Sequence, residues 1–300
     1  RDRDGLIASY RDAGYPQVEV APDIAMSPDR RQATVRFRVL PGARIEVDHV
    51  VLAGLHRTRE AVLRRELRLA EGEPLGLSRV LDSQRRLGGL GLFQRISVTE
   101  MDPEAEGKRS VVVAVEEAPL TNLGYGLGYA EQDQLRFSVD LTRRNLFGMD
   151  RSLSTFARVS FKSSRLLATY REPYLLGRKQ ELLFTAFREE AERPYYSFVR
   201  YGTTLQTARS LTASWKLIAR YTYQLTNTFN IQNPSQVGRD YASSTTSGPS
   251  ASLVRDTRDD PLDPRRGHFV SADLQLSSVS LGGDSFFKAF FQGSAYQRLA

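Results

Sequence analysis

Residues 122–129 read NLGYGLGY, and this stretch decides which fold we expect. After Asn122, large apolar residues alternate with glycine at every second position: Leu123, Tyr125, Leu127 and Tyr129 against Gly124, Gly126 and Gly128. A period of two is that of a β-strand, whose successive side chains point to opposite faces. A dinucleotide-binding loop is excluded, because its glycines have a different spacing and lead into a helix. The stretch predicts a β-strand with one apolar face and one face without side chains.

The same alternation continues downstream, in LRFSVDLT (135–142) and in LTASWKLIARYTYQL (211–225). A strand as long as the second of these is unusual in a soluble protein, and no helical pattern interrupts the chain after residue 120. The polar faces carry full charges, which suit a water-filled lumen better than a dry core: Arg136, Asp140, Arg158, Lys216, Arg220 and Asp273. We therefore expect an antiparallel transmembrane β-barrel rather than a soluble β-sandwich.

The strand pattern predicts ten strands, over residues 121–130, 134–144, 150–161, 164–171, 180–189, 195–208, 211–227, 244–256, 268–280 and 285–299. Compact segments follow every second strand, as in RRNLFGMD (143–150) and REPYLLGRKQ (171–180). The alternate connections include the long stretch 227–243. Outer-membrane barrels have short turns on the periplasmic side and longer loops outside. We therefore assign the compact segments to the periplasmic side.

One of these compact segments, RDTRDDPLDPRRGHF (255–269), concentrates four Asp, four Arg, two Pro and one Gly. A calcium loop of the EF-hand type would need a different order of acidic residues and glycine, and the interleaved arginines would oppose a cation. Pro fixes φ, Gly permits positive φ and Asp accepts hydrogen bonds from its own backbone. The segment predicts a tight, charged turn and no metal site.

The first 119 residues contain a repeated unit. A helix ending at Gly14 is followed by strand-like YPQVEV and ATVRFRVL (33–40), and a helix from Ser78 is followed by FQRISV and SVVVAV. The second copy also has a first strand at 44–55 and an earlier helix, REAVLRREL, which Thr58 is expected to cap. We expect Val80, Leu81, Leu87 and Leu90 on the inner side of the helix from Ser78. The order predicts an α+β unit, β-α-α-β-β, preceded by the last three elements of another.

Composition restricts the class of function. The sequence has no Cys and three His, without ligand or nucleophile spacing, so we expect no metal, no cofactor and no catalytic residue. Residues 1–119 hold 19 basic and 19 acidic side chains, so the net charge of +7 lies in the remainder. It is spread singly along strands rather than in a basic block, which argues against nucleic-acid binding. An uninterrupted apolar run long enough for a transmembrane helix is absent from the sequence.

The succession of these parts resembles the BamA/TamA outer-membrane assembly superfamily, in which polypeptide-transport-associated (POTRA) units precede a barrel. The resemblance rests on the glycine–strand–strand endings of both repeats, on NLGYGLGY, on RRNLFG and EPYLLG, and on DTRDDPLDPRRG. It implies three parts: the end of one POTRA unit (1–42), a complete POTRA unit (43–119) and the first part of an outer-membrane barrel (120–300), which would have about sixteen strands in all.

The resemblance also implies a function, the assembly and insertion of other β-barrel proteins. Unfolded outer-membrane proteins would be the clients, periplasmic partners would bind the POTRA units, and residues 122–129 would form a lateral gate. Glycine weakens a strand, and a weak edge strand can pair with a client strand; alternatively, the glycines only make room in the lumen. The other functions that fit the sequence are a two-partner-secretion transporter and a passive pore.

Overall fold

The computed structural model describes residues 2–27, 33–101, 107–131, 133–232 and 243–298. The chain forms two compact units, one of Arg1–Leu120 with Phe147–Asp150 and the other of Thr121–Leu146 with Arg151–Ala300. In the ranges that the structure describes, every helix is too short or too polar to cross a membrane.

The first unit begins with the incomplete repeat. Helix α1 (Asp2–Asp12) is followed by an antiparallel pair of strands, β1 (Glu19–Met26) and β2 (Ala33–Leu40). Gly14 follows the helix with a positive φ of 93°, which is the conformation that glycine adopts most easily after a helix end. The order helix, glycine, strand, strand is the one expected. The polar turn expected between the two strands falls on residues 28–32, outside the described residues.

The second repeat has the expected β-α-α-β-β order: β3 (Glu46–Ala53), α2 (Glu60–Arg64), α3 (Leu77–Gly89), β4 (Phe93–Glu100) and β5 (Lys108–Glu117). Strand β5 lies in the centre of the sheet, parallel to β3 and antiparallel to β4. Both β3 and β4 are therefore edge strands of this sheet in the described chain. The turn expected at 101–109 lies partly outside the described residues.

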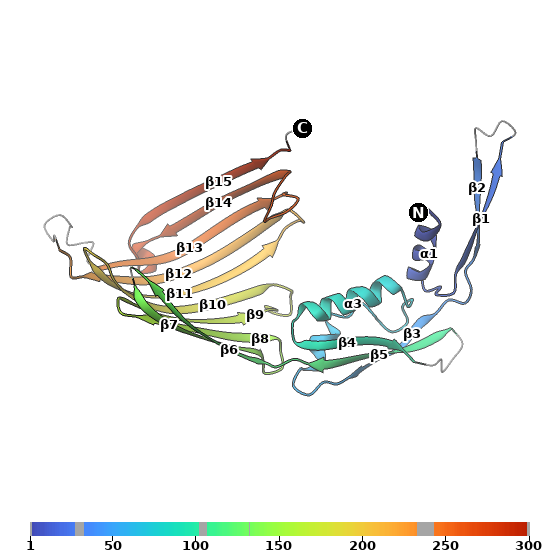
Figure 1. Ribbon diagram of the computed structural model, residues 1–300, viewed down its shortest axis with the longest axis horizontal. Helices are drawn as coiled ribbons and strands as arrows, with labels where there is room; N and C mark the ends of the chain where they lie inside the picture. Colours follow the sequence, from blue (N-terminus) through green and yellow to red (C-terminus); the bar gives the residue numbers. More distant parts are fainter. Residues whose placement is uncertain (1, 28–32, 102–106, 132, 233–242, 299–300) are drawn as a thin grey trace. The chain divides into compact units, whose positions relative to one another are not determined.

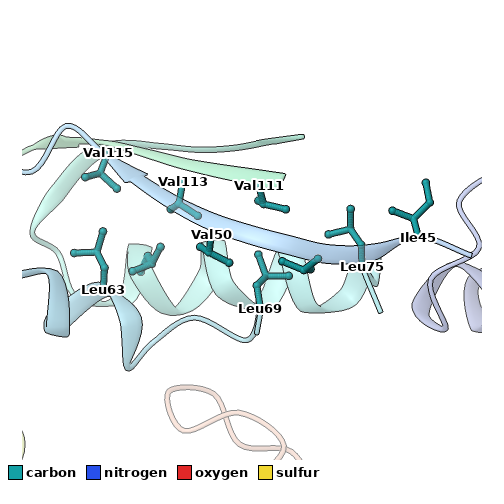
Figure 2. Packing of buried hydrophobic residues seen from close by; sticks show 10 residues of the cluster. Ile45, Val50, Leu63, Leu69, Leu75, Val111, Val113 and Val115 are labelled. Carbon is teal, nitrogen blue, oxygen red and sulfur yellow. The ribbon is translucent and has the colours of Figure 1, made fainter. Parts of the chain in front are cut away.

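A single apolar layer between this sheet and its helices forms the core of the first unit (Figure 2). Val111 and Val113 of β5 are fully buried and contact the layer that contains Leu63 and Leu87. Each fully buried Val or Leu contributes roughly 1.5–3 kcal/mol of transfer free energy. The alternation of SVVVAV places a valine at every second position, Val111, Val113 and Val115, in this layer, as a half-buried strand requires.

Two local expectations for this unit are wrong. Leu81, expected on the inner side of α3, is 48% exposed, because the buried stripe of the helix is narrow and runs through Ser83 and Leu87. Thr58 does not cap α2: the N-cap residue is Arg59, which makes no side-chain cap hydrogen bond. The backbone N–H of Thr58 instead donates to Glu117 (2.7 Å), and this pairing holds Thr58 one residue before the cap position.

The second unit is one antiparallel sheet of ten strands in sequence order, as expected (Figure 1). Its strands are β6 (Thr121–Ala130), β7 (Gln134–Leu146), β8 (Arg151–Ser160), β9 (Ser163–Glu172), β10 (Glu181–Glu192), β11 (Ser197–Ser210), β12 (Trp215–Phe229), β13 (Ser243–Asp256), β14 (Gly267–Ser277) and β15 (Phe286–Tyr296). A short 3-10 helix, η3 (Val279–Leu281), lies between the last two strands. Within the connection expected at 227–243, residues 233–242 lie outside the described ones.

The strand expected at 211–227 begins four residues later than the alternation suggests. Residues 211–214 form the turn before β12, and Thr212 Oγ1 accepts hydrogen bonds from the N–H groups of Ser214 (3.3 Å) and Trp215 (3.1 Å). A Ser/Thr turn of this kind can also alternate apolar and polar residues. The strand expected at 268–280 ends three residues earlier than expected, at Ser277, because η3 follows it.

The strand register divides the sheet into an apolar face and a polar face. Phe137 lies between Leu127 and Val159 on the apolar face, whereas Asp140 lies between Gly124 and Phe156 on the polar face. Followed through all strand pairs, the polar face carries the six charges singled out in the sequence: Arg136, Asp140, Arg158, Lys216, Arg220 and Asp273.

Candidate functional site

Strand β6 is the terminal strand of the ten-stranded sheet, with β15 at the opposite end. Within the described residues β6 pairs only with β7, and its other edge has no hydrogen-bonded neighbour. All eight residues proposed from the sequence lie on it: Asn122, Leu123, Gly124, Tyr125, Gly126, Leu127, Gly128 and Tyr129. An unpaired edge presents backbone N–H and C=O groups that a further strand can bind.

Side chains of β7 occupy the space above the three glycines of β6. Opposite Gly124, the carboxylate of Asp140 lies where a Cβ atom would have to be. A Cβ at Gly126 would lie 2.9 Å from Ser138 Oγ, and a Cβ at Gly128 would lie 2.9 Å from Arg136 Nε. The sequence suggested a bare glycine face. In the structure, three polar side chains of the neighbouring strand cover this face.

The apolar side chains of β6 are more exposed than those of the inner strands, because β6 has a neighbour on only one side in this sheet. Tyr125 is 83% exposed and Leu127 is 75% exposed, compared with 44% for Leu205 on β11. Phe291 on β15, the strand at the other end of the sheet, is similarly exposed at 70%. The two faces of β6 therefore differ sharply in chemistry.

The six charges of the polar face are spread over β7, β8, β12 and β14 and do not form one cluster. Arg220 Nε donates to Gln206 Oε1 (2.9 Å), and Ser252 donates to Asp273. Beside them a polar hollow of about 460 Å³ is lined by Arg220, Thr222, Ser250, Asp273, Gln275, Lys288 and parts of Leu274 and Phe290. Among the described residues, no group of three His, Cys, Asp or Glu side chains is placed to hold a metal ion.

The charged segment between β13 and β14 is a tight turn whose Asp259 accepts backbone hydrogen bonds. Asp259 Oδ1 accepts from the N–H groups of Arg265 (2.9 Å) and Arg266 (3.1 Å). These hydrogen bonds hold the pKa of Asp259 below its usual value. Gly267 ends the turn with a φ of 101°, as expected for a glycine at such a position.

Glu117, at the end of β5, binds the loop that precedes α2, which the sequence did not reveal. Its carboxylate accepts the N–H groups of Thr58 (2.7 Å), Arg57 (3.1 Å) and His56 (3.4 Å). Burial acts to raise the pKa of Glu117, but hydrogen bonds from Thr58, Arg57 and His56 outweigh it and lower the pKa. Three successive N–H groups aimed at one carboxylate form an anion nest.

The hairpin turn Phe147–Asp150 belongs to the first unit and contacts the same loop. The carbonyl of Gly148 accepts a hydrogen bond from the N–H of Arg59 (2.9 Å). Gly148 has a φ of 72°, and the carbonyl oxygen of Arg57 lies in the space that a Cβ would need. The glycine of RRNLFG is therefore required by both conformation and close approach.

Two parts of the chain match protein-family models: residues 145–300 match the Omp85 superfamily domain, and residues 45–118 match POTRA, described as a surface antigen variable number repeat. BamA, the outer membrane protein assembly factor of Neorickettsia risticii, is 24% identical over 304 residues, which cover 97% of this chain and 40% of the relative. BamA of Nitratidesulfovibrio vulgaris is 22% identical over 298 residues, covering 97% of this chain and 37% of the relative.

Among solved structures, BamA from Haemophilus ducreyi lacking POTRA domains 1–3 has the same fold, with a TM-score of 0.77 and 18% identity. The match covers 98% of this chain and 59% of that one. This chain thus spans about two fifths of the length of the curated relatives. The resemblance seen in the sequence is confirmed: with more than half of its residues in the matching domain, the chain belongs to the Omp85 superfamily.

Proposed function

We propose that this chain is part of an outer-membrane factor that assembles and inserts other β-barrel proteins. The names of the relatives and the succession of a POTRA region and a ten-stranded sheet support the proposal. In it, residues 1–42 end one POTRA unit, 43–119 form a complete one and 120–300 form the first part of the barrel. The POTRA units lie in the periplasm of a bacterium with an outer membrane.

The two faces of the ten-stranded sheet then meet different surroundings. The apolar face, with Phe137, Val139 and Leu217, contacts lipid, and the polar face, with its six charges, lines a water-filled lumen. The turns after β7, β9, β11 and β13 lie on the periplasmic side. This placement leaves the charges hydrated and the large apolar side chains out of water, which is the arrangement with the lowest solvation free energy for both.

Strand β6 acts as the lateral gate through which clients enter the membrane. When its pairing with the last barrel strand opens, the outer edge of β6 offers backbone N–H and C=O groups to a client strand, and these groups impose no sequence requirement. Three glycines lower its intrinsic strand stability, so that exchange of one neighbour for another costs little. No covalent bond is made or broken in this exchange, so the mechanism requires neither a cofactor nor a catalytic residue, and the protein is not an enzyme.

Clients are unfolded outer-membrane proteins, which the POTRA units receive before they reach the gate. The edge strand β4 of the complete unit can bind an extended segment of a client or of a periplasmic partner by strand addition, whereas the first half of β3 is already bonded to residues 72–75. Nucleic acid is not expected as a partner, because the basic residues are spread singly along the strands of the sequence.

The observation that carries the proposal is the glycine-containing first strand of the sheet, whose three glycines lie under side chains of β7. To test it, the full-length protein is reconstituted in liposomes and the folding of a urea-denatured client barrel is followed by its heat-modifiable band. A disulfide that joins Asn122→Cys to the last barrel strand should abolish client folding until it is reduced. No native Cys among the 300 residues competes with it.

The matched control joins β6 to its permanent neighbour. Leu127→Cys and Phe137→Cys lie directly opposite each other in the β6–β7 pair, so their disulfide leaves the outer edge free and client folding should continue. If the locked edge inserts clients at the normal rate, β6 is not the gate.

A further inference from the structure

The apolar face of the sheet contains a groove of about 520 Å³ whose lining residues come from β10 to β15. Its floor is made of small side chains, Ala219 and Ala251, together with Pro249. Larger apolar side chains form its walls: Leu182, Leu205, Tyr221, Leu274, Leu276 and Phe287. The groove is therefore shaped for a long, flexible apolar chain rather than for a flat or polar ligand.

Pro249 explains why the groove lies at this position. A proline has no N–H and cannot donate to a neighbouring strand. The β13–β14 pairing ends at Ser250, the residue next to Pro249. The hydrogen-bond ladder between β13 and β14 is thus interrupted beside Ala219 and Ala251, whose small side chains leave space on the apolar face.

Two unneutralised arginines lie beyond one end of the groove. Arg209 on β11 and Arg255 on β13 both lie on the apolar face. Strands β11–β14 contribute no other Lys, Arg, Asp or Glu residue to this face. Within the described residues neither forms an ion pair, and the Nε of Arg255 is buried without a hydrogen-bond partner. Trp215 lies beside them, with the Arg255 guanidinium carbon 5.5 Å from its ring centroid.

Two arginines elsewhere on this face are neutralised within the chain. Arg151 pairs with Glu172, and Arg188 pairs with Glu190 (2.7 Å). Arg209 and Arg255, in contrast, have no carboxylate partner on this face among the described residues. The pair Arg209 and Arg255 therefore calls for a negative group from outside the chain.

We propose that Arg209, Arg255 and Trp215 bind the phosphate headgroup of an anionic phospholipid whose acyl chain lies in the groove. Arg255 is four residues from Ala251, or about 13 Å along the strand, so a headgroup at the arginines places the middle of its acyl chain over the alanine floor. Guanidinium groups bind phosphate with paired hydrogen bonds, and Trp is favoured at the membrane interface. The inference rests on the proposed membrane placement of this face, but not on client assembly.

The test is native mass spectrometry of the full-length protein released from detergent, with phosphatidylglycerol or phosphatidylcholine added at equal concentration. The wild-type protein should retain one phosphatidylglycerol with about tenfold preference over phosphatidylcholine. The R209Q/R255Q variant should lose that preference, whereas R209K/R255K, which keeps the charge, should retain part of it. Ala251→Leu, which fills the groove, should lower the retention of both lipids.

The matched control is Arg188→Gln on the same face, where an arginine already paired with Glu190 is removed; its lipid preference should equal that of the wild type. Equal retention of the two lipids by the wild type, or an unchanged preference in a folded R209Q/R255Q variant, overturns the site. Client folding is measured separately on the same preparations. A protein that prefers phosphatidylglycerol but inserts no client contradicts the assembly function and leaves the lipid site standing.

Discussion

The carboxylate of Asp140 occupies the position that a side chain on Gly124 would need. This relationship joins the two explanations that the sequence left open for the glycines. They do make room, but the occupants of that room are side chains of β7, held against the strand proposed to be the gate. The glycines therefore serve packing, and the same packing determines which side chains the proposed gate exposes.

Replacing Gly124 and Gly126 together with Val should slow client insertion while the full-length protein still folds. The β-branched residues favour a regular strand, and they also displace Asp140 and Ser138. Insertion is measured in liposomes by the heat-modifiable client band. Adding Asp140→Gly separates the two effects: recovery of the rate indicates that the clash was responsible, and no recovery indicates that the stiffer edge was.

Val139→Arg should impair barrel formation, because Val139 lies on the apolar face, where an arginine near the bilayer midplane costs roughly 2–4 kcal/mol. Its neighbour Ser138 lies on the polar face opposite Arg158. Ser138→Arg should be tolerated better, and Ser138→Glu best, because it can pair with Arg158. The measurement is the heat-modifiable fraction of each variant in the membrane. Equal damage from Val139→Arg and Ser138→Glu contradicts the assignment of faces.

Glu117→Gln should loosen the loop before α2 at neutral pH. The pKa of Glu117 is lowered in the folded protein, so its contribution to stability is present above the ordinary value of 4.5 and is lost as the pH falls through the lowered value. Hydrogen–deuterium exchange at Arg57 and Thr58 should be faster in the variant at pH 7. At pH values below the lowered pKa, the variant and the wild type should exchange alike. Glu116→Gln, which affects only the exposed pair with Arg95, is the control.

Asp259→Ala should open the turn between β13 and β14. Its carboxylate accepts two backbone N–H groups across the turn, those of Arg265 and Arg266. Trypsin should therefore cleave after these arginines faster in the variant than in the wild type. Asp263→Ala is the matched control, because Asp263 is exposed and pairs only with the Arg265 side chain among the described residues. Equal cleavage of both variants would contradict the role of Asp259.

Gly148→Ala should disturb the contact between the turn Phe147–Asp150 and the loop before α2. Gly177→Ala is its control, since both glycines have positive φ but only Gly148 faces a backbone oxygen in the space for a Cβ. Each substitution adds about 1 kcal/mol of backbone strain, and only Gly148→Ala should increase hydrogen exchange at the Arg59 N–H. Identical exchange at Arg59 in both variants would show that the close approach has no consequence.

The sequence predicted the parts of the fold that depend on local alternation. It did not predict features that depend on side-chain hydrogen bonds or on contacts between residues distant in the sequence. A period of two is visible in LRFSVDLT without knowledge of its neighbours, and so the ten strands and their faces were predictable. The beginning of β12 was not, because the residues before Trp215 alternate like a strand although Thr212 folds them into a turn. The Glu117 nest joins residues about sixty positions apart, which no local pattern indicates.

The covering of Gly124, Gly126 and Gly128 has a consequence for how the edge can evolve. One face of the terminal strand presents an acid, a hydroxyl and a base in succession, and all three belong to β7. The backbone that would bind an incoming strand and the chemistry that this strand would meet are thus encoded in separate segments. Selection can alter the charge order at this edge by changing β7, while the glycine strand and its hydrogen-bonding geometry stay untouched.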